Sequence, residues 1–319
     1  MPELRKIHPL NYILIGGIIF LCSFGIYQIA GWSASDENDP DDNPRRNYAV
    51  FSLDIPSEID FAGESVPLEQ LDVLENIDRE LLVNTYFQSQ TLLFIKRANR
   101  YFPVIEPILK KYGVPDDFKY MAIAESGLAN VVSPSDAVGF WQFLEGTARD
   151  YGLEVNDEID ERYHVEKSTE VACKYLLESH QKYGNWTLTA ASYNAGRKGV
   201  DKQIDRQKEL NYYDLLLGEE TERYIFRILS YKIIMEKPSE YGFYVGRNHL
   251  YPQVPYEEVT VNGKVEDFAL FAKSYGISYK TLKWMNPWLR DSFLTNAGGN
   301  SYNIRIPKKG YFKMSESEQ

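Results

Sequence analysis

Apolar residues recur at helical spacing from residue 68 to about residue 237, and Gly and Pro interrupt the pattern at short intervals. The pattern predicts helices at residues 69–83, 86–111, 116–126, 166–182, 186–194 and 220–236. Ser168, with Glu170 in the first turn, is the predicted N-cap of the fourth run. In the last run, one buried stripe is predicted from Tyr224, Ile228, Tyr231 and Met235. This part of the chain is therefore predicted to be an α-helical domain.

The pattern changes after Pro238. Two short runs, "YEEVTV" and "YNIRIP", alternate as strands do. The segments between them, "VEDFALFAKSYG" and "SYKTLKWMN", are predicted to be two helices. Residues 255–307 are therefore predicted to form a small β-α-α-β domain, followed by a disordered tail at 308–319. The predicted fold class is mainly α, with a helical domain at 57–240 and this second, smaller domain.

The N-terminal region contains an uncharged apolar run at residues 10–32. As a helix it would span roughly 35 Å, which is enough to cross a bilayer. Arg5 and Lys6 precede it and "SDENDPDD" follows, so the positive-inside rule places the rest of the chain outside the cytoplasm. We expect a cytoplasmic segment at 1–9, a transmembrane signal-anchor at 10–32 and a flexible acidic linker at 33–56. A cleaved signal peptide is the alternative.

Composition excludes several classes of function. The chain has 319 residues and a formal charge of −11, which argues against a nucleic-acid partner but leaves a neutral glycan open. Cys22 and Cys173 make no disulfide framework. The four histidines are scattered without metal-ligand spacing, so neither a metal site nor another cofactor is expected. They are His8, His164, His180 and His249.

One carboxylate lies in an unusual place, in "FKYMAIAESGLANV" at residues 118–131. On a helix, Glu125 shares the apolar stripe of Phe118, Met121 and Ala122. Gly127 is a predicted helix end, which puts Glu125 in the last turn, where the helix dipole disfavours a carboxylate. Burial and the dipole should both raise its pKa. A raised pKa suits a group that donates a proton to the leaving oxygen of a glycosidic bond.

Two further clusters accompany Glu125. The loop "SPSDAVGFWQF", residues 133–143, delivers Trp141 and Gln142, and "ASYNAG", residues 191–196, ends a helix with Tyr193 and Asn194. Taken singly, each has a structural explanation as packing or as a helix terminus. Ordinary glycoside hydrolysis also needs a second carboxylate. Sequence alone does not choose among the candidates Asp136, Glu145 and Glu220.

Taken in order, these motifs resemble a known family. The order is a Glu-Ser pair, a Ser-Pro loop that ends in Gly-Phe-Trp-Gln, the sequence Ala-Ser-Tyr-Asn-Ala-Gly, and "ETERY" at 220–224. Together these four motifs resemble the lytic murein transglycosylases of glycoside hydrolase family 23, which are relatives of goose-type lysozyme. The upstream segment from "IDRELLVNTYF" to "VPDDFKY" resembles the membrane-bound D type. The resemblance covers about residues 56–307 and implies a lysozyme-like domain with a catalytic core at about 113–237.

The resemblance implies a mechanism with Glu125 as the single catalytic acid and base. It would protonate the oxygen between N-acetylmuramic acid (MurNAc) and N-acetylglucosamine (GlcNAc), then accept the proton of the muramic C6 hydroxyl, which closes a 1,6-anhydro ring. By the same matching, Ser133, Gln142 and Tyr193 would hydrogen-bond the sugar. Asn194 and Gly196 would shape a turn, and Glu220 and Tyr224 would support the cleft. The implied partners are peptidoglycan glycan strands and, through the N-terminal helix, a bacterial inner membrane, with the catalytic domain facing the periplasm.

Two departures from the family pattern stand out. Asp136 occupies a position where the family usually has Gly, and Asp tolerates a positive φ better than most residues. The C-terminal unit resembles a LysM carbohydrate-binding module, but "KVEDFA" replaces its usual Gly-Asp-Thr-Leu start, which should affect glycan affinity more than fold. Two alternative functions stay open: a muramidase that adds water, and a non-catalytic wall-binding scaffold.

Overall fold

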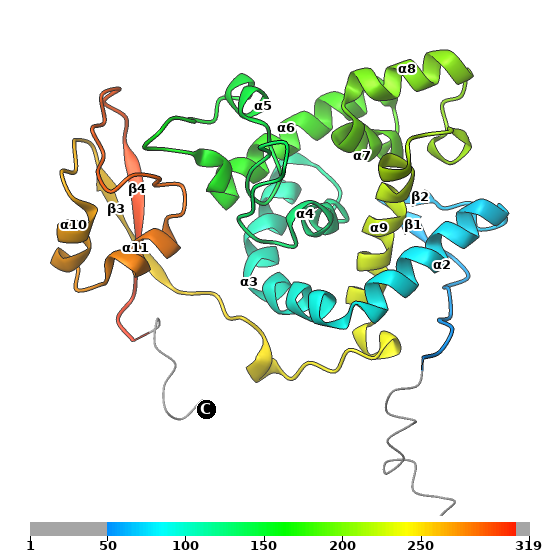
Figure 1. Ribbon diagram of the computed structural model, residues 1–319, viewed down its shortest axis with the longest axis horizontal. Coiled ribbons are helices and arrows are strands. Elements are labelled where there is room, and N and C mark those ends of the chain that lie inside the picture. The colour runs from blue at the N-terminus through cyan, green and yellow to red at the C-terminus, as the bar shows by residue number, and fades with distance from the viewer. Residues whose placement is uncertain (1–49, 311–319) are drawn as a thin grey trace, which may run out of the picture. The chain divides into compact units, whose positions relative to one another are not determined.

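The computed structural model describes residues 50–310 of the chain (Figure 1). Residues Leu53–Gln319 form one compact unit, and the other unit, Met1–Ser52, lies almost wholly outside the described residues. The predicted anchor at 10–32 and most of the predicted linker and tail also lie outside them. Within residues 50–310, no helix has both the length and the apolar character that a membrane crossing requires.

The helical domain contains all six predicted helices, with ends that differ from the prediction by a few residues at most. They are α2 (Leu71–Tyr86), α3 (Gln88–Tyr112), α4 (Phe118–Ser126), α6 (Val165–Tyr183), α7 (Trp186–Ala195) and α9 (Glu219–Glu236). The predicted cap of α6 is wrong: the helix begins at Val165, and the Ser168 hydroxyl donates back to the His164 carbonyl at 2.8 Å. The mainly α fold class is confirmed.

The sequence pattern did not predict two helices of this domain, α5 (Glu145–Asp150) and α8 (Arg197–Gln207). The sequence of α8 is dominated by charged and amide side chains, and Val200 is its one fully buried residue. A helix that buries so little has almost no hydrophobic periodicity to detect. Short 3₁₀ turns complete the domain: η1 (Glu161–Tyr163), η2 (Tyr212–Asp214), η3 (Pro238–Tyr241) and η4 (Arg247–His249).

Helix α4 lies in the middle of the domain, with α2, α3, α6 and α9 arranged around it in the view of Figure 1. Helices α3 and α9 pack directly on it. Besides the predicted apolar stripe, Tyr120 and Ile123 are also buried. The description of α4 as an amphipathic helix with one apolar stripe is therefore too narrow, because its neighbours cover most of its surface.

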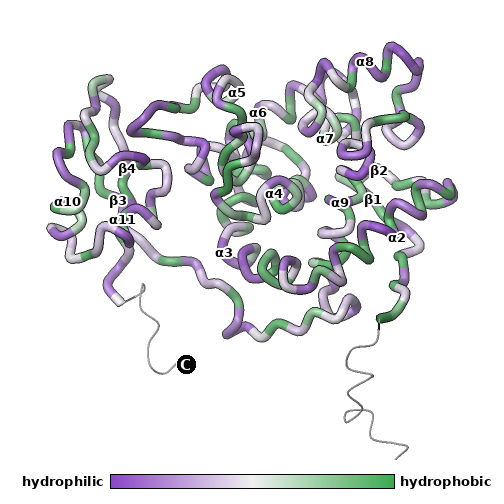
Figure 2. Tube along the Cα trace, in the orientation of Figure 1, coloured by the Kyte–Doolittle hydropathy of each residue, from purple (hydrophilic) through white to green (hydrophobic). Residues whose placement is uncertain are grey.

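The surrounding helices are amphipathic. Figure 2 shows hydrophobic and hydrophilic stretches alternating along α2 and α3, as expected for helices that bury one face. The predicted stripe on α9 is correct in three positions: Tyr224, Ile228 and Tyr231 are buried, and Met235 is partly buried. The N-terminal edge of the packed body includes Leu53 and Ile55, which lie in the segment assigned to the linker.

Two small antiparallel sheets occur among the described residues. The first pairs β1 (Asp60–Phe61) with β2 (Glu64–Ser65). The second pairs β3 (Tyr256–Val261) with β4 (Tyr302–Pro307), with Val261 opposite Tyr302. Helices α10 (Phe268–Ser274) and α11 (Tyr279–Met285) lie between β3 and β4 in sequence, as the β-α-α-β pattern predicts. The Asp267 side chain caps α10 by accepting two backbone N–H bonds, so "KVEDFA" still provides a helix start.

The β-α-α-β domain packs on the helical domain. Its core, built around Phe268, also contains Ile159 and Tyr163 from the helical domain. Polar contacts join the same surfaces: the Tyr302 hydroxyl donates to Glu154 at 2.9 Å, and Arg305 pairs with Glu166 at 2.6 Å. The segment that connects the two domains runs along α3, where Tyr251 donates its backbone N–H to the Lys96 carbonyl at 3.2 Å.

Candidate active site

Glu125 is held in the last turn of α4 by the way that helix ends. Gly127 has φ of 60° and donates its N–H to the Ile123 carbonyl at 2.8 Å. A Cβ at residue 127 would lie 2.3 Å from a ring carbon of Phe94. Glycine is therefore required at residue 127 for two reasons: the backbone is left-handed, and α3 approaches it closely. The helix ends where the sequence predicted.

The Glu125 side chain is half-buried and lines a cavity of about 690 Å³. The Tyr224 hydroxyl, which comes from α9 and is only 1% exposed, donates a hydrogen bond to Oε1 of Glu125. The remaining walls come from α2, α3 and α9, with the polar side chains Glu80, Asn84, Ser89, Gln90, Arg97, Arg223 and Arg227. A polar cavity thus opens beside a carboxyl group that has one oxygen already occupied.

The surroundings of Glu125 favour its protonated form. Burial raises the pKa of Glu125 to about 7, and the nearby Glu220 carboxylate acts in the same direction. The Tyr224 hydrogen bond and the Arg227 charge oppose this rise without cancelling it. At neutral pH a large fraction of Glu125 therefore carries a proton, which is the state a general acid needs.

An ion-pair cluster on the cavity wall was not found by sequence reasoning. Glu80, on α2 and only 1% exposed, pairs with Arg223 at 2.6 Å and with Arg227 at 3.9 Å. Glu80 and Arg223 are 143 positions apart, so no local pattern joins them. The one sequence signal of this cluster is the spacing of Arg223 and Arg227, which places both arginines on one face of α9. The cluster fixes Arg227 near the candidate acid.

Ser133 and Gln142 make their hydrogen bonds inside their own loop. The Ser133 hydroxyl oxygen accepts the N–H groups of Ala137 at 3.0 Å and Ser135 at 3.3 Å. The Gln142 amide donates to the carbonyls of Gly139 at 2.8 Å and Val131 at 3.2 Å. These contacts fold the loop and involve neither residue with Glu125. The family resemblance predicts that both side chains hydrogen-bond the sugar, and this role stays a prediction.

The loop is anchored to the core at several points. Trp141 is fully buried and donates its indole N–H to the Thr169 hydroxyl at 2.8 Å. Ser126, next to the candidate acid, donates to the Phe140 carbonyl at 2.9 Å, which ties the loop to the end of α4. A Cβ at Gly139 would lie 2.1 Å from the Arg162 carbonyl oxygen, so only glycine fits there. Asp136 has φ of 60°, the conformation that its substitution for glycine predicted.

The third motif approaches Glu125 through Tyr193. The Tyr193 hydroxyl donates to the Trp141 carbonyl at 2.7 Å. Burial and the neighbouring Glu125 carboxylate raise the pKa of Tyr193 well above its usual value, so its hydroxyl stays protonated. Asn194 accepts a hydrogen bond from the Thr221 hydroxyl at 2.8 Å, and Gly196 directly follows α7. The motif therefore joins the loop, α7 and α9.

Of the three candidate second carboxylates, Glu220 lies near Glu125 and the other two do not. Glu220 is exposed but close enough for its charge to act on Glu125. Asp136 and Glu145 instead line a separate cavity of about 520 Å³. Of the predicted site residues, the structure thus gathers Glu125, Tyr193, Glu220 and Tyr224, and it holds Ser133, Gln142 and Asn194 in the supporting loop and helix end.

Comparison with known proteins gives matches for both domains. Residues 103–216 match the model of the transglycosylase SLT domain, and residues 257–310 match the soluble lytic transglycosylase C-terminal LysM-like domain. Over 269 residues the chain is 29% identical to the membrane-bound lytic murein transglycosylase D of Escherichia coli K12, which covers 81% of this chain and 57% of that protein. The protein of the same name from Escherichia coli O6:H1 matches equally well.

The chain thus spans little more than half the length of these relatives. The two domain matches fall on the elements described above, the first from α3 to η2 and the second from β3 to β4. The resemblance inferred from the motifs is confirmed: this protein carries a transglycosylase SLT domain followed by a LysM-like domain of the soluble lytic transglycosylase type.

Proposed function

We propose that this protein is a peptidoglycan lytic transglycosylase, which cleaves the β-1,4 bond between MurNAc and GlcNAc without water and leaves 1,6-anhydromuramoyl ends. The observation that carries the proposal is Glu125: a carboxyl group with a pKa of about 7 at the wall of a polar cavity in an SLT domain. The name of the Escherichia coli relatives points to the same activity.

In the first step Glu125 acts as the acid. Because Tyr224 donates to Oε1, the proton that Glu125 gives away is held on Oε2. Oε2 passes this proton to the bridging oxygen while the bond from that oxygen to C1 of MurNAc breaks. The GlcNAc end leaves as an alcohol, and positive charge develops at C1. The Tyr224 hydrogen bond and the Arg227 charge stabilise the carboxylate that Glu125 has become.

In the second step the same carboxylate acts as the base. It accepts the proton of the MurNAc C6 hydroxyl while that oxygen bonds to C1 and closes the anhydro ring. The substrate supplies the nucleophile, so no second catalytic carboxylate is needed. The surroundings of Glu125 are consistent with this route, since Glu80 is engaged by Arg223 and the exposed Glu220 acts only through its charge.

The remaining predicted site residues position the loop and α9 or contact the sugar. Tyr193 positions the Trp141 segment of the loop through its hydroxyl. Ser133 and Gln142 contact the sugar through the hydrogen-bonding atoms that their loop contacts leave unused, namely the Ser133 hydroxyl proton and the Gln142 carbonyl oxygen. Asn194 keeps the start of α9 in place through Thr221.

The proposed setting is the periplasmic face of a bacterial inner membrane. Residues 10–32 act as a single-pass anchor, residues 33–52 as a spacer, residues 53–240 as the catalytic domain and residues 255–307 as the wall-binding domain. Support comes from the charge pattern around residues 10–32 and from the name of the Escherichia coli relatives, which describes them as membrane-bound.

Product analysis tests the function. Mass spectrometry of digested peptidoglycan should find anhydro-ended fragments with the wild-type chain. Products with reducing ends alone would assign the muramidase reaction instead. Binding to peptidoglycan with no fragments of either type would assign the scaffold function.

A further inference from the structure

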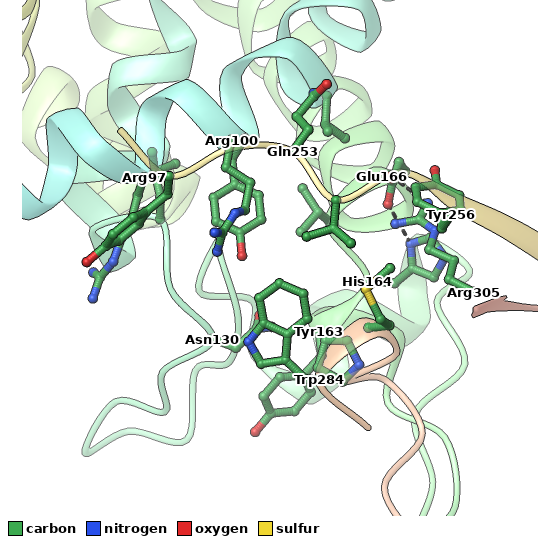
Figure 3. A pocket seen from close by; sticks show the side chains of 18 of the residues that line it. Arg97, Arg100, Asn130, Tyr163, His164, Glu166, Gln253, Tyr256, Trp284 and Arg305 are labelled. Carbon is green, nitrogen blue, oxygen red and sulfur yellow. Dashed lines mark hydrogen bonds and ion pairs between the residues drawn. The ribbon is translucent and has the colours of Figure 1, made fainter. Parts of the chain in front are cut away.

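A second cavity, of about 720 Å³, lies between the helical domain and the LysM-like domain. Helix α3 forms one wall and α11 with the end of β4 forms the other, as Figure 3 shows. The connecting segment at residues 251–256 and the start of α6 close the remaining sides. Neither the matched domains nor the mechanism above assigns a role to this cavity.

The second cavity is adjacent to the cavity of Glu125. Arg97 lines both, and its guanidinium donates to the Gly127 carbonyl at 2.9 Å. The segment that leaves α4 also separates them: Gly127 and Val131 face the Glu125 cavity, whereas residues 128–130 face the second one. A polymer bound at Glu125 would therefore have its neighbouring groups within reach of the second cavity.

The lining of the second cavity is basic although the chain as a whole carries a charge of −11. Glu166 is the one carboxylate among its lining residues, and it already pairs with Arg305 at 2.6 Å. The basic side chains that line it are Arg97, Arg100, Arg305 and Lys308. This cavity is therefore a place where an acidic ligand is attracted to an otherwise acidic protein.

Two of these arginines are held in place without a carboxylate. The polar contacts of Arg97 and Arg100 described in the structure are to backbone carbonyls, those of Gly127 and Pro252, both at 2.9 Å. The Arg100 guanidinium also lies 5.3 Å from the centre of the Trp284 ring. In Figure 3 Arg100 extends from α3 toward Trp284, which faces it from the opposite wall, and Arg97 comes from the same helix.

We propose that this cavity binds the stem peptide of the peptidoglycan strand that is held at Glu125, with Arg97 and Arg100 pairing with its carboxylates. The proposal rests on the proposed function. Arginine binds carboxylates through two parallel hydrogen bonds, and the neighbouring aromatic rings cover the apolar parts of a peptide. A neutral sugar would form no ion pair with these two guanidinium groups, which have no acidic partner among residues 50–310. Trp284, 43% exposed, provides the apolar surface.

The first experiment compares two substrates for the full-length chain: glycan strands that carry their stem peptides and strands stripped of them by an amidase. For the wild type, kcat/KM should be higher with peptide-bearing strands. In the Arg100→Gln variant the ratio of the two kcat/KM values should fall about tenfold, since one charge-assisted pair is lost. Arg100→Lys, which keeps the charge, should retain part of the ratio.

The matched control is Arg206→Gln, because Arg206 lies exposed on α8 and does not line the cavity. It should leave the ratio unchanged. If Arg100→Gln also leaves the ratio unchanged, the proposal is wrong. The proposal is equally wrong if activity falls by the same factor on both substrates, because the arginine then supports the fold or contacts the sugar.

The second experiment does not depend on catalysis and so separates this inference from the proposed function. Isothermal titration calorimetry measures binding of the free stem tetrapeptide to the full-length chain. The tetrapeptide should bind the wild type and the Arg206→Gln variant, and Arg100→Gln should weaken binding about tenfold. No binding to the wild type would overturn the inference even if the enzyme is active. Binding by a chain that cleaves nothing would refute only the proposed function.

Discussion

The hydroxyl of Tyr224 donates a hydrogen bond to Oε1 of Glu125, although the two residues are 99 positions apart in the chain. The bond joins the end of α4 to α9 and occupies Oε1, so in the proposed mechanism proton transfer is assigned to Oε2. It also stabilises the charged form of Glu125 against the effect of burial. Four experiments test the packing and electrostatics around Glu125.

Removing the donor should raise the pKa of Glu125 further. In Tyr224→Phe the carboxylate loses its hydrogen bond, so we expect kcat to fall about 10- to 100-fold, because this charge-assisted bond supports the base form in the second step. The alkaline limb of the pH profile should move to higher pH. The control is Tyr244→Phe, since Tyr244 is 82% exposed. A Tyr224→Phe enzyme with unchanged kcat would show that the bond has no catalytic role.

Activity should decline as pH rises through about 7, because kcat/KM depends on the protonated form of Glu125. The Glu220 charge raises that pKa, so Glu220→Gln should shift the alkaline limb to lower pH. Glu222→Gln is the matched control, as Glu222 lies on the same helix and is not among the charges that act on Glu125. A shift of the limb to higher pH in Glu220→Gln would contradict the account.

Glu125 should also make stability depend on pH. Its pKa is raised from 4.5 unfolded to about 7 folded, so its ionisation costs the folded state free energy that appears as pH rises between these values. Glu125→Gln should therefore be more stable than the wild type above pH 7, by about 3 kcal/mol, and equally stable near pH 4. Urea unfolding at a series of pH values measures this. A constant difference at all pH values would contradict the raised pKa of Glu125.

Two helix-ending glycines offer a matched test of packing. Gly127→Ala strains a backbone at φ of 60° and puts a methyl group 2.3 Å from Phe94. We expect a loss of about 3 kcal/mol in the free energy of unfolding. Gly184 ends α6 with φ of 74°, and a methyl group there would have no atom of another residue within 4 Å, so Gly184→Ala should lose only about 1 kcal/mol. Equal losses would mean that Phe94 moves aside freely.

Much of the fold could be predicted because its helices bury apolar faces. The stripe on α9 and the end of α4 at Gly127 follow from local spacing alone. Helix α8 could not be found in this way, since Val200 is its one fully buried residue. The predicted cap of α6 failed because Ser168 bonds back to the preceding turn, which a sequence pattern does not distinguish from capping.

The candidate site was predictable in part for a similar reason. Glu125 stood out because a carboxylate among apolar residues is costly, a rule that needs no tertiary information. Its partner Tyr224 entered only through family resemblance, and the pairing of Glu80 with Arg223 was missed, because these contacts join distant segments. Resemblance likewise predicted that Ser133 and Gln142 bind the sugar, which stays a prediction, and the structure adds the loop contacts that no local pattern indicated.

The central claim is that Glu125 drives cleavage with the substrate's own hydroxyl as nucleophile. Mass spectrometry of peptidoglycan digested in parallel with the wild type and with Glu125→Gln tests it most directly. The account predicts anhydromuramoyl ends, each lighter than a reducing end by one water, from the wild type and no cleavage by the variant. Reducing ends from the wild type, or undiminished cleavage by Glu125→Gln, would contradict it.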